Sequence, residues 1–132
     1  LLFRSKAVVL MDAQIDHATG LLSLREGPPI ELYVTPCVFE DLTTGLPVLK
    51  VLEHYCGVHL HLLPVAGDQR LAEFPVEGFE GLRFRAIAIP GKAPPYSPHR
   101  HQPTVGDNIV EGNENFTVTL SSSNASVTGS PR

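Results

Sequence analysis

Features that would identify several protein classes at once are scarce in this sequence. Charged residues make up 18% of its 132 positions, below the roughly 25% that is usual in soluble domains. The formal net charge of −4 argues against a basic face for nucleic acid. No apolar run approaches the roughly 20 residues of a membrane span. We therefore expect no nucleic acid partner and no membrane span.

Motifs that carry catalysis are also missing. The sequence has no Gly-x-Ser-x-Gly, no glycine-rich phosphate loop, no Cys-x-x-Cys and no zinc-protease helix motif. Cys56 lies near His54 and His59, but a base adjacent in sequence rarely has the geometry that activates a thiol. Two pairs of carboxylates are interpreted as surface charges: Asp12 with Asp16, and Glu77 with Glu80. We expect no enzyme activity.

The chain begins Leu1-Leu2-Phe3, with neither a methionine nor a signal peptide. We expect a piece of a longer protein, with a length that suits one domain or one domain and part of a neighbour. Residues 1–40 are predicted to form N-terminal strands of a preceding module or of the same sandwich. Residues 41–121 are predicted to form the main sandwich, and residues 122–132 a Ser/Thr-rich linker.

Only two cysteines are present, Cys37 and Cys56. They either form a disulfide or remain as two buried thiols; a bridge would close a loop of about 20 residues and contribute about 3 kcal/mol. Two N-glycosylation sequons begin at Asn115 and Asn124. Their closeness within a Ser/Thr-rich stretch indicates a glycoprotein that is extracellular or on the cell surface.

Glycine and proline are plentiful, at 11 and 12 residues, so many turns and short elements are expected. Alternation and short apolar runs predict strands over residues 6–11, 21–24, 30–35, 58–65, 82–89 and 116–120. The first two are expected to form a hairpin closed at Thr19-Gly20. Residues 90–104 are rich in proline and are predicted to form a long surface loop.

One helix is predicted, over residues 44–57, because apolar residues recur there at helical spacing and Gly57 suits a helix end. Strands predominate, so the predicted fold class is mostly β: an Ig-like antiparallel β-sandwich, with or without one short helix. The alternative is an α+β fold in which strand 30–35, helix 45–56 and strand 58–65 form a crossover unit.

A C-terminal segment carries an ordered set of residues: Asp107, Glu111, Gly112, Glu114, Phe116 and Leu120. This pattern resembles the closing motif of Calx-beta domains, in which Glu-Gly-x-Glu-x-Phe leads into a strand. Residues 15–24, with Ile-Asp-x-x-Thr-Gly, are similar to the hairpin of cadherin repeats, although more weakly. Both resemblances imply an extracellular β-sandwich, and the first implies a module that either binds Ca²⁺ or is purely structural.

The acidic turn before the last strand supplies oxygen donors that suit Ca²⁺. The candidate ligands are Asp107, Asn108, Glu111 and Glu114. The other interpretation is a solvated acidic turn, which keeps a sheet edge from pairing with other chains. Both interpretations stay open, and calcium is the only cofactor expected.

Histidines offer an alternative metal site. His59 and His61 are two residues apart on a predicted strand, so they face the same way. Together with His99 and His101 of the proline-rich loop they would provide the nitrogen donors of a Zn or Cu site. The other interpretation is that these side chains are exposed to water.

The leading functional hypothesis is an extracellular adhesion or matrix module within a larger or filamentous assembly. Its partners would be proteins, including copies of itself. A His-rich metal-binding β protein and an α+β partner-binding domain are the alternatives.

Overall fold

The computed structural model describes residues 7–100, 114–122 and 126–129, and all structural statements below concern this part of the chain. Its elements, in chain order, are β1 (Ala7–Val9), α1 (Ile15–Ala18), the 3₁₀ helix η1 (Thr19–Leu24), β2 (Ile30–Val34), α2 (Pro36–Thr43), α3 (Val48–Leu52), β3 (Val58–Leu62), β4 (Leu71–Phe74), β5 (Leu82–Pro90), β6 (Glu114–Ser122) and β7 (Ser126–Gly129). Strands β1-β2-β3 form a parallel sheet, and β4-β5-β6-β7 form an antiparallel sheet.

Strand β2 lies at the centre of the parallel sheet, where it pairs with β1 on one side and β3 on the other. Leu32 and Val34 on one of its faces are fully buried, and Tyr33 on the opposite face is 3% exposed. Burial of both faces is typical of a parallel strand covered by helices and by a second layer. The strand therefore forms the middle of the molecule.

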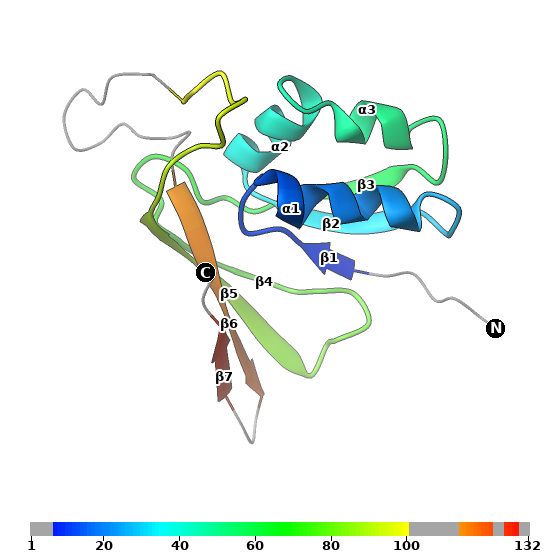
Figure 1. Cartoon of the computed structure of the whole chain (residues 1–132). Coiled ribbons are helices and arrows are strands. Elements are labelled where there is room, and N and C mark those ends of the chain that lie inside the picture. Colours follow the sequence, from blue (N-terminus) through cyan, green and yellow to red (C-terminus); the bar gives the residue numbers. More distant parts are fainter. Residues whose placement is uncertain (1–6, 101–113, 123–125, 130–132) are drawn as a thin grey trace.

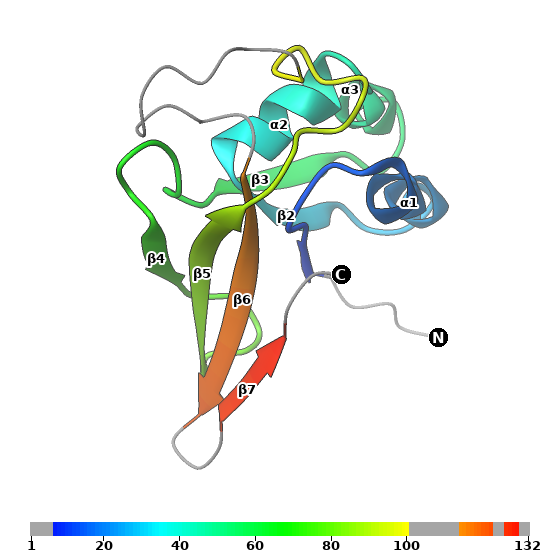
Figure 2. The same ribbon diagram turned by 60° about the vertical axis from the view of Figure 1, so that its left-hand side comes forward.

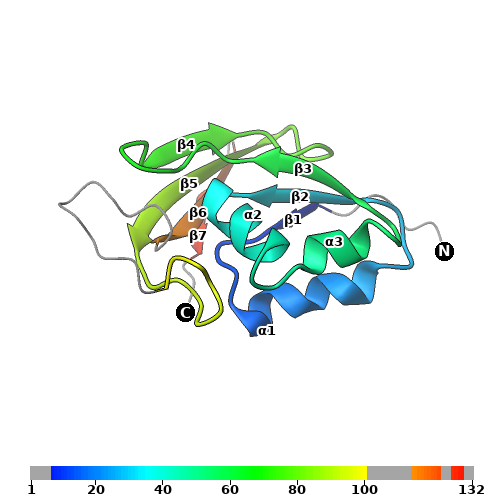
Figure 3. The same ribbon diagram turned by 90° about the horizontal axis from the view of Figure 1, so that it is seen from above.

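Three layers follow from this arrangement (Figure 3). Between the helices and the parallel sheet, the core contains Leu21, Leu32, Val34, Leu42 and Leu52, among others. Between the two sheets, a second core contains Tyr33, Leu63, Val65, Phe74 and Ala86, among others. Figure 1 shows the helices on one side of β1-β2-β3 and the antiparallel sheet on the other.

The prediction of a mostly β, Ig-like antiparallel sandwich is wrong. Residues 15–24, expected to contain part of a hairpin closed at Thr19-Gly20, form α1 and η1 instead. Ala18 and Leu21, three residues apart, both point into the helix-side core, a spacing that helices favour and strands do not. The short run 21–24 was too brief to distinguish the two periods.

The α+β alternative comes closer, since β2 and β3 are parallel and helices connect them. The crossover contains two helices rather than one, and the helix predicted over residues 44–57 is confined to α3. Pro36 occupies the first turn of α2, where its missing N–H is tolerated. The side chain of Thr35 caps this helix by accepting from the Val38 N–H.

The strands predicted at residues 30–35, 58–65, 82–89 and 116–120 are confirmed as β2, β3, β5 and β6. The predicted boundary between residues 40 and 41 falls within α2, and the division into domains stays a prediction. Within the described ranges, no helix combines the length and the apolar character needed to cross a membrane.

Leu32 and Leu60 lie opposite each other in the register of β2 and β3, but Leu32 is fully buried and Leu60 is 37% exposed. We expect Leu32→Ala to lower the free energy of unfolding by about 2–5 kcal/mol, because it leaves a cavity. Leu60→Ala is the matched control and should lower it by less than half as much. Urea denaturation followed by circular dichroism measures both, and equal losses would contradict this burial pattern.

Candidate functional site

Buried polar side chains gather where the parallel strands end. The described residues contain Asp12, Thr35, Asp41 and Ser97 as their buried polar or charged members. Asp12 follows β1, Thr35 follows β2, and α2 starts directly after Thr35. The carboxyl ends of parallel strands are the usual place for ligands in α/β sheets. We therefore take this edge, called the carboxyl edge below, as the candidate site.

Asp12 and His17 form the central pair of the carboxyl edge. Oδ1 of Asp12 accepts from the Gln14 N–H at 3.0 Å and lies 2.6 Å from Nδ1 of His17. The short helix α1 begins at Ile15, so its first turn carries the His17 ring back toward Asp12. Asp12 is nearly inaccessible, at 6% side-chain exposure, whereas His17 is 40% exposed.

The electrostatics of the pair follow from this geometry. The hydrogen bond that Asp12 accepts from His17 holds the pKa of His17 above its ordinary value of 6.5, against the opposing effect of burial. Since a carboxylate only accepts, Nδ1 of His17 is assigned as the donor. Nε2 lies 3.8 Å from the exposed carboxylate of Asp16. An imidazole held through one nitrogen, with the other beside an exposed carboxylate, is an arrangement that can move protons.

A segment that follows β5 closes over the same edge. Ser97 Oγ donates to Oδ1 of buried Asp41 at 2.5 Å, and the Tyr96 hydroxyl donates to the Ala13 carbonyl. Burial raises the pKa of Asp41, and burial likewise raises the pKa of Tyr96 to about 12. The Tyr96 hydroxyl thus keeps its proton at neutral pH. Figure 2 shows this segment, in yellow, passing over α2.

His59 and His61 lie in a second cluster, on the face of the parallel sheet opposite the helices. Nδ1 of His59 lies 2.8 Å from Oε1 of Glu31, and Nε2 of His61 lies 2.7 Å from Oε2 of the same carboxylate. The His61 ring stacks on Tyr33 with centroids 4.3 Å apart. The hydrogen bond from His59, followed by that from His61, lowers the pKa of Glu31.

The predicted four-histidine metal site is not assembled in the described part of the chain. His99 lies 2.6 Å from the carboxylate of Glu40 on α2 rather than beside His59 and His61, and His101 lies outside the described residues. Among the described residues, no group of three or more His, Cys, Asp or Glu side chains is arranged to hold a metal ion. Metal binding by these histidines stays a prediction.

Most of the predicted calcium site lies outside the described residues, namely Asp107, Asn108 and Glu111. Glu114 is the first residue of β6 and pairs in register with Pro90. The sequon residue Asn115 follows it on the same strand, opposite Ile89; Asn124 is outside the described residues. Their roles in calcium binding and glycosylation stay predictions.

The structure does not join Cys37 and Cys56 in the expected disulfide. Cys37 lies in the first turn of α2, and Cys56 lies beyond the end of α3. Both thiols are partly buried. This arrangement agrees with the alternative of two separate thiols more closely than with a crosslink.

Sequence reasoning missed the residues of the carboxyl edge. Asp12 was interpreted as a surface charge, which is wrong because it is 5% exposed. Its position after an apolar strand and before a helix would have suggested the end of a parallel strand. No local signal marks Asp41 or Ser97, because their contact joins positions 56 residues apart.

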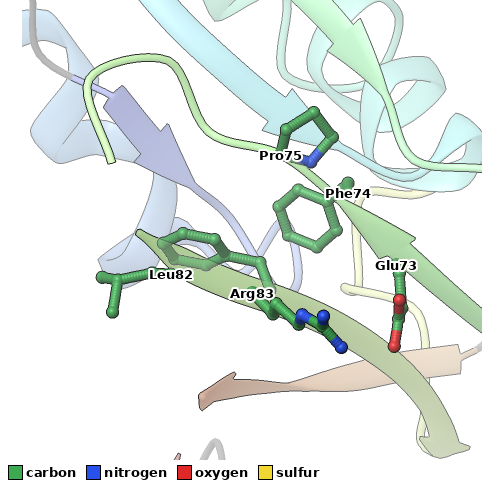
Figure 4. A pocket seen from close by; sticks show the side chains of 6 residues that line it. Glu73, Phe74, Pro75, Leu82 and Arg83 are labelled. Carbon is green, nitrogen blue, oxygen red and sulfur yellow. The ribbon is translucent and has the colours of Figure 1, made fainter. Parts of the chain in front are cut away.

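A separate hollow of about 240 Å³ lies between β4 and β5 (Figure 4). It is lined by Glu73, Phe74, Pro75, Leu82, Arg83 and Phe84. None of the buried polar side chains of the carboxyl edge takes part in it. The carboxyl edge is therefore the stronger candidate.

The chain resembles known proteins over most of its length. The family model described as "Beta-lactamase superfamily domain" matches residues 2–119. The chain is 56% identical over 103 residues to "Coenzyme PQQ synthesis protein B" of Methylobacillus flagellatus, covering 77% of the chain and 33% of the relative. It is 51% identical over 113 residues to the protein of the same name from Methylococcus capsulatus, covering 83% and 36%.

A solved structure shares the fold. The crystal structure of Zn²⁺-bound PqqB from Methylobacterium extorquens matches 93% of this chain and 37% of that one, with a TM-score of 0.60 and 22% identity. At this identity the likeness shows the fold alone. The chain spans about a third of the length of the curated relatives that it matches.

These comparisons overturn several predictions. The Calx-beta and cadherin resemblances are wrong, because a different family model covers residues 2–119, far more than the short motifs that suggested them. The adhesion or matrix function and the extracellular location are overturned by relatives named for coenzyme synthesis. The same findings overturn the expectation of no enzyme activity. The structural neighbour is a Zn²⁺-bound protein, so the comparison points to a different metal and does not support the expected calcium cofactor.

We expect Asp12→Asn to bring the pKa of His17 down toward 6.5, because the amide lacks the charge that stabilises the imidazolium. With a raised folded-state pKa, the pair stabilises the protein below pH 6.5 and loses this effect as the pH rises through the folded-state value. In Asp12→Asn, the free energy of unfolding should therefore fall less steeply over this pH range than in the parent protein. Histidine NMR titration measures the pKa; Asp16→Asn is the control, and an equal shift there would contradict the assignment.

The stability contributed by Glu31 depends on pH in the opposite sense to that of the Asp12–His17 pair. Its lowered pKa means that its hydrogen bonds to His59 and His61 stabilise the protein above pH 4.5, and that this contribution is lost as the pH falls through the folded-state value. We expect Glu31→Gln to be less stable near neutral pH and to show a flatter acid limb in urea titrations. Glu53→Gln, at an exposed position, should reproduce the parent curve. An unchanged acid limb in Glu31→Gln would contradict the prediction.

Proposed function

This chain belongs to the beta-lactamase superfamily domain family, and from that premise we propose that it forms part of a coenzyme PQQ synthesis protein B. The observation that carries the proposal is the identity of 56% over 103 residues to a protein of that name. Because the chain spans about a third of such relatives, the proposal concerns the whole protein to which this segment belongs. The activity proposed is enzymatic, in the synthesis of coenzyme PQQ.

Within that protein, the carboxyl edge contributes an acid–base group. His17 gives or takes a proton at Nε2, the nitrogen that Asp12 does not hold. Asp12 holds Nδ1 at 2.6 Å, which fixes the orientation of the ring and stabilises its protonated form. Because its pKa is raised, a larger fraction of His17 carries a proton near neutral pH than at the ordinary pKa. Asp12 is itself held by the Gln14 N–H.

The Zn²⁺ named for the structural neighbour is not matched by the described residues alone. Asp12 and His17 are hydrogen-bonded to each other, and within the described ranges no group of three or more His, Cys, Asp or Glu side chains is arranged to hold a metal ion. We therefore derive no step that passes through a metal ion. The proposed partners of the whole protein are other proteins, including copies of itself.

The proposal is tested in a PQQ-producing bacterium whose own synthesis protein B is replaced by the full-length protein that contains this chain. PQQ is measured by liquid chromatography and mass spectrometry. We expect His17→Ala to lower PQQ formation by roughly 10²–10⁴-fold, the usual contribution of a positioned acid–base group. His54→Ala, which changes an exposed histidine after α3, should form PQQ at the parent level.

Two outcomes would count against the proposal at different levels. If the parent full-length protein does not restore PQQ formation, the assignment to coenzyme PQQ synthesis is wrong. If the parent restores it and His17→Ala is equally active, the acid–base role of the carboxyl edge is wrong. Equal losses in His17→Ala and His54→Ala would also reject a specific role for His17.

A further inference from the structure

Strand β3 forms one edge of the parallel sheet, because the strand order is β1-β2-β3. Its hydrogen bonds to β2 fix which way its backbone groups point. The Ile30 N–H donates to the Gly57 carbonyl at 3.1 Å, and the Leu63 N–H donates to the Val34 carbonyl at 2.8 Å. Backbone groups of successive residues in a strand point to opposite sides. The residues whose N–H and C=O groups point to the open edge are therefore Val58, Leu60 and Leu62.

Side chains leave this edge open as well. The two carboxylate oxygens of Glu31 hold the rings of His59 and His61 at 2.8 Å and 2.7 Å, which draws both rings toward β2 and away from the edge. Strand β3 contains no proline or lysine, and it pairs residue by residue with β2, without a bulge. Proline, lysine and bulges are the usual devices that protect a sheet edge from pairing with another chain. The edge of β3 is therefore suited to accept a further strand.

Apolar side chains beside the edge are exposed to water. Leu60 and Leu62 are 37% and 50% exposed, on the face of the sheet that the helices cover elsewhere. Val51 on α3 and Tyr55 just after it are 43% and 55% exposed. Figures 1 and 2 show α3 and β3 on the same side of the molecule, away from β7. Burying such side chains against a partner would be favourable.

The sequence of β3 has nearly the same pattern when it is read in either direction from its middle residue: Val58-His59-Leu60-His61-Leu62. A two-fold symmetric interface brings one surface against itself, so it needs such a pattern. Antiparallel pairing centred on Leu60 places Leu60 opposite its own copy and Val58 opposite Leu62 of the second copy. The backbone groups that point to the edge then face one another as hydrogen-bonded pairs. The pattern thus favours a second copy of this chain as the occupant.

The remainder of the full-length protein is joined to the fold at other places. The described chain begins with Ala7 of β1, at the opposite edge of the parallel sheet, and ends with Gly129 of β7, in the antiparallel sheet. Because the chain spans about a third of the curated relatives, the remainder is large. Its points of attachment are nevertheless beside β1 and β7, which also favours a second copy as the occupant of the β3 edge.

We propose that two copies of the full-length protein associate through β3, by antiparallel pairing about a two-fold axis at Leu60. The two parallel sheets then form one continuous sheet, with the helices of both copies on the same face. Leu60 and Leu62 lose their contact with water, and Val51 and Tyr55 border the interface. The inference specifies a surface for the self-association included in the proposed function, and it rests on that function only for the full-length protein that is tested.

Cysteine crosslinking in the full-length protein tests the register. In Leu60→Cys the two new thiols lie opposite each other, with Cα atoms about 5.5 Å apart, within the range of a disulfide. Leu62→Cys is the matched control, because its thiols lie about 13 Å apart along the strands at about 3.3 Å per residue. We expect oxidised glutathione to convert Leu60→Cys, but neither Leu62→Cys nor the parent protein, into a covalent dimer on non-reducing gels. Random collisions would instead favour Leu62, the more exposed position.

Sedimentation velocity measures the association itself. We expect the parent full-length protein to sediment as a dimer at micromolar concentration. Leu60→Lys places two like charges opposite each other and should raise the dissociation constant by roughly 10–100-fold. Phe79→Lys changes an equally accessible apolar residue, 51% exposed in the turn before β5, and should leave the dissociation constant unchanged. Circular dichroism checks that both variants keep the parent fold.

A monomeric parent protein would overturn the proposal, whether the edge is covered by the remainder of the same molecule or kept for a different protein. Equal crosslinking of Leu60→Cys and Leu62→Cys would also overturn it, as would an unchanged dissociation constant in Leu60→Lys. These readouts do not depend on PQQ formation. A parent protein that dimerises through β3 but does not restore PQQ formation would therefore keep this inference and reject the proposed function.

Discussion

Burial of strand β2 on both faces is the constraint on which the other parts of the structure depend. Leu32 and Val34 face the helices, and Tyr33 faces the antiparallel sheet. Because neither face meets water, the strand needs a layer on each side; the helices supply one and the antiparallel sheet supplies the other. The carboxyl ends of β1 and β2 then lie at one edge. That edge is where a buried carboxylate can be reached by a helix start and by a returning loop.

The antiparallel sheet supports this arrangement rather than carrying the site. The rings of Tyr33, Phe74 and Phe84 follow one another, with centroids 5.7 Å and 5.6 Å apart. The Tyr33 hydroxyl accepts from the Glu77 N–H at 3.2 Å, so the polar end of this buried ring is satisfied. Strand β5 also leads into the 93–100 segment. The same sheet that covers β2 therefore delivers Tyr96 and Ser97 to the carboxyl edge.

Local pattern predicted four of the strands but neither α1 nor α2, and it did not predict how the sheets assemble. Alternation identified β2, β3, β5 and β6, because a pleated strand places every second side chain on one face. It did not specify whether neighbours run parallel or antiparallel. The change at residues 34–36 shows the limit, since β2 ends at Val34 and α2 begins at Pro36. Local pattern could not reveal the burial of Asp41, because its contact with Ser97 joins positions 56 residues apart, and the Tyr96–Ala13 bond beside Asp12 joins positions 83 residues apart.

The short C-terminal motif misled for a related reason. Residues 116–120 do form a strand, as predicted, within β6. A strand that follows an acidic turn is, however, compatible with any antiparallel sheet, and folds share such parts without sharing function. The distinguishing features lie elsewhere, in the parallel order β1-β2-β3 and in the polar groups at its carboxyl edge. A function is better inferred from what the topology brings together than from a motif confined to one strand, because only the former places side chains in contact.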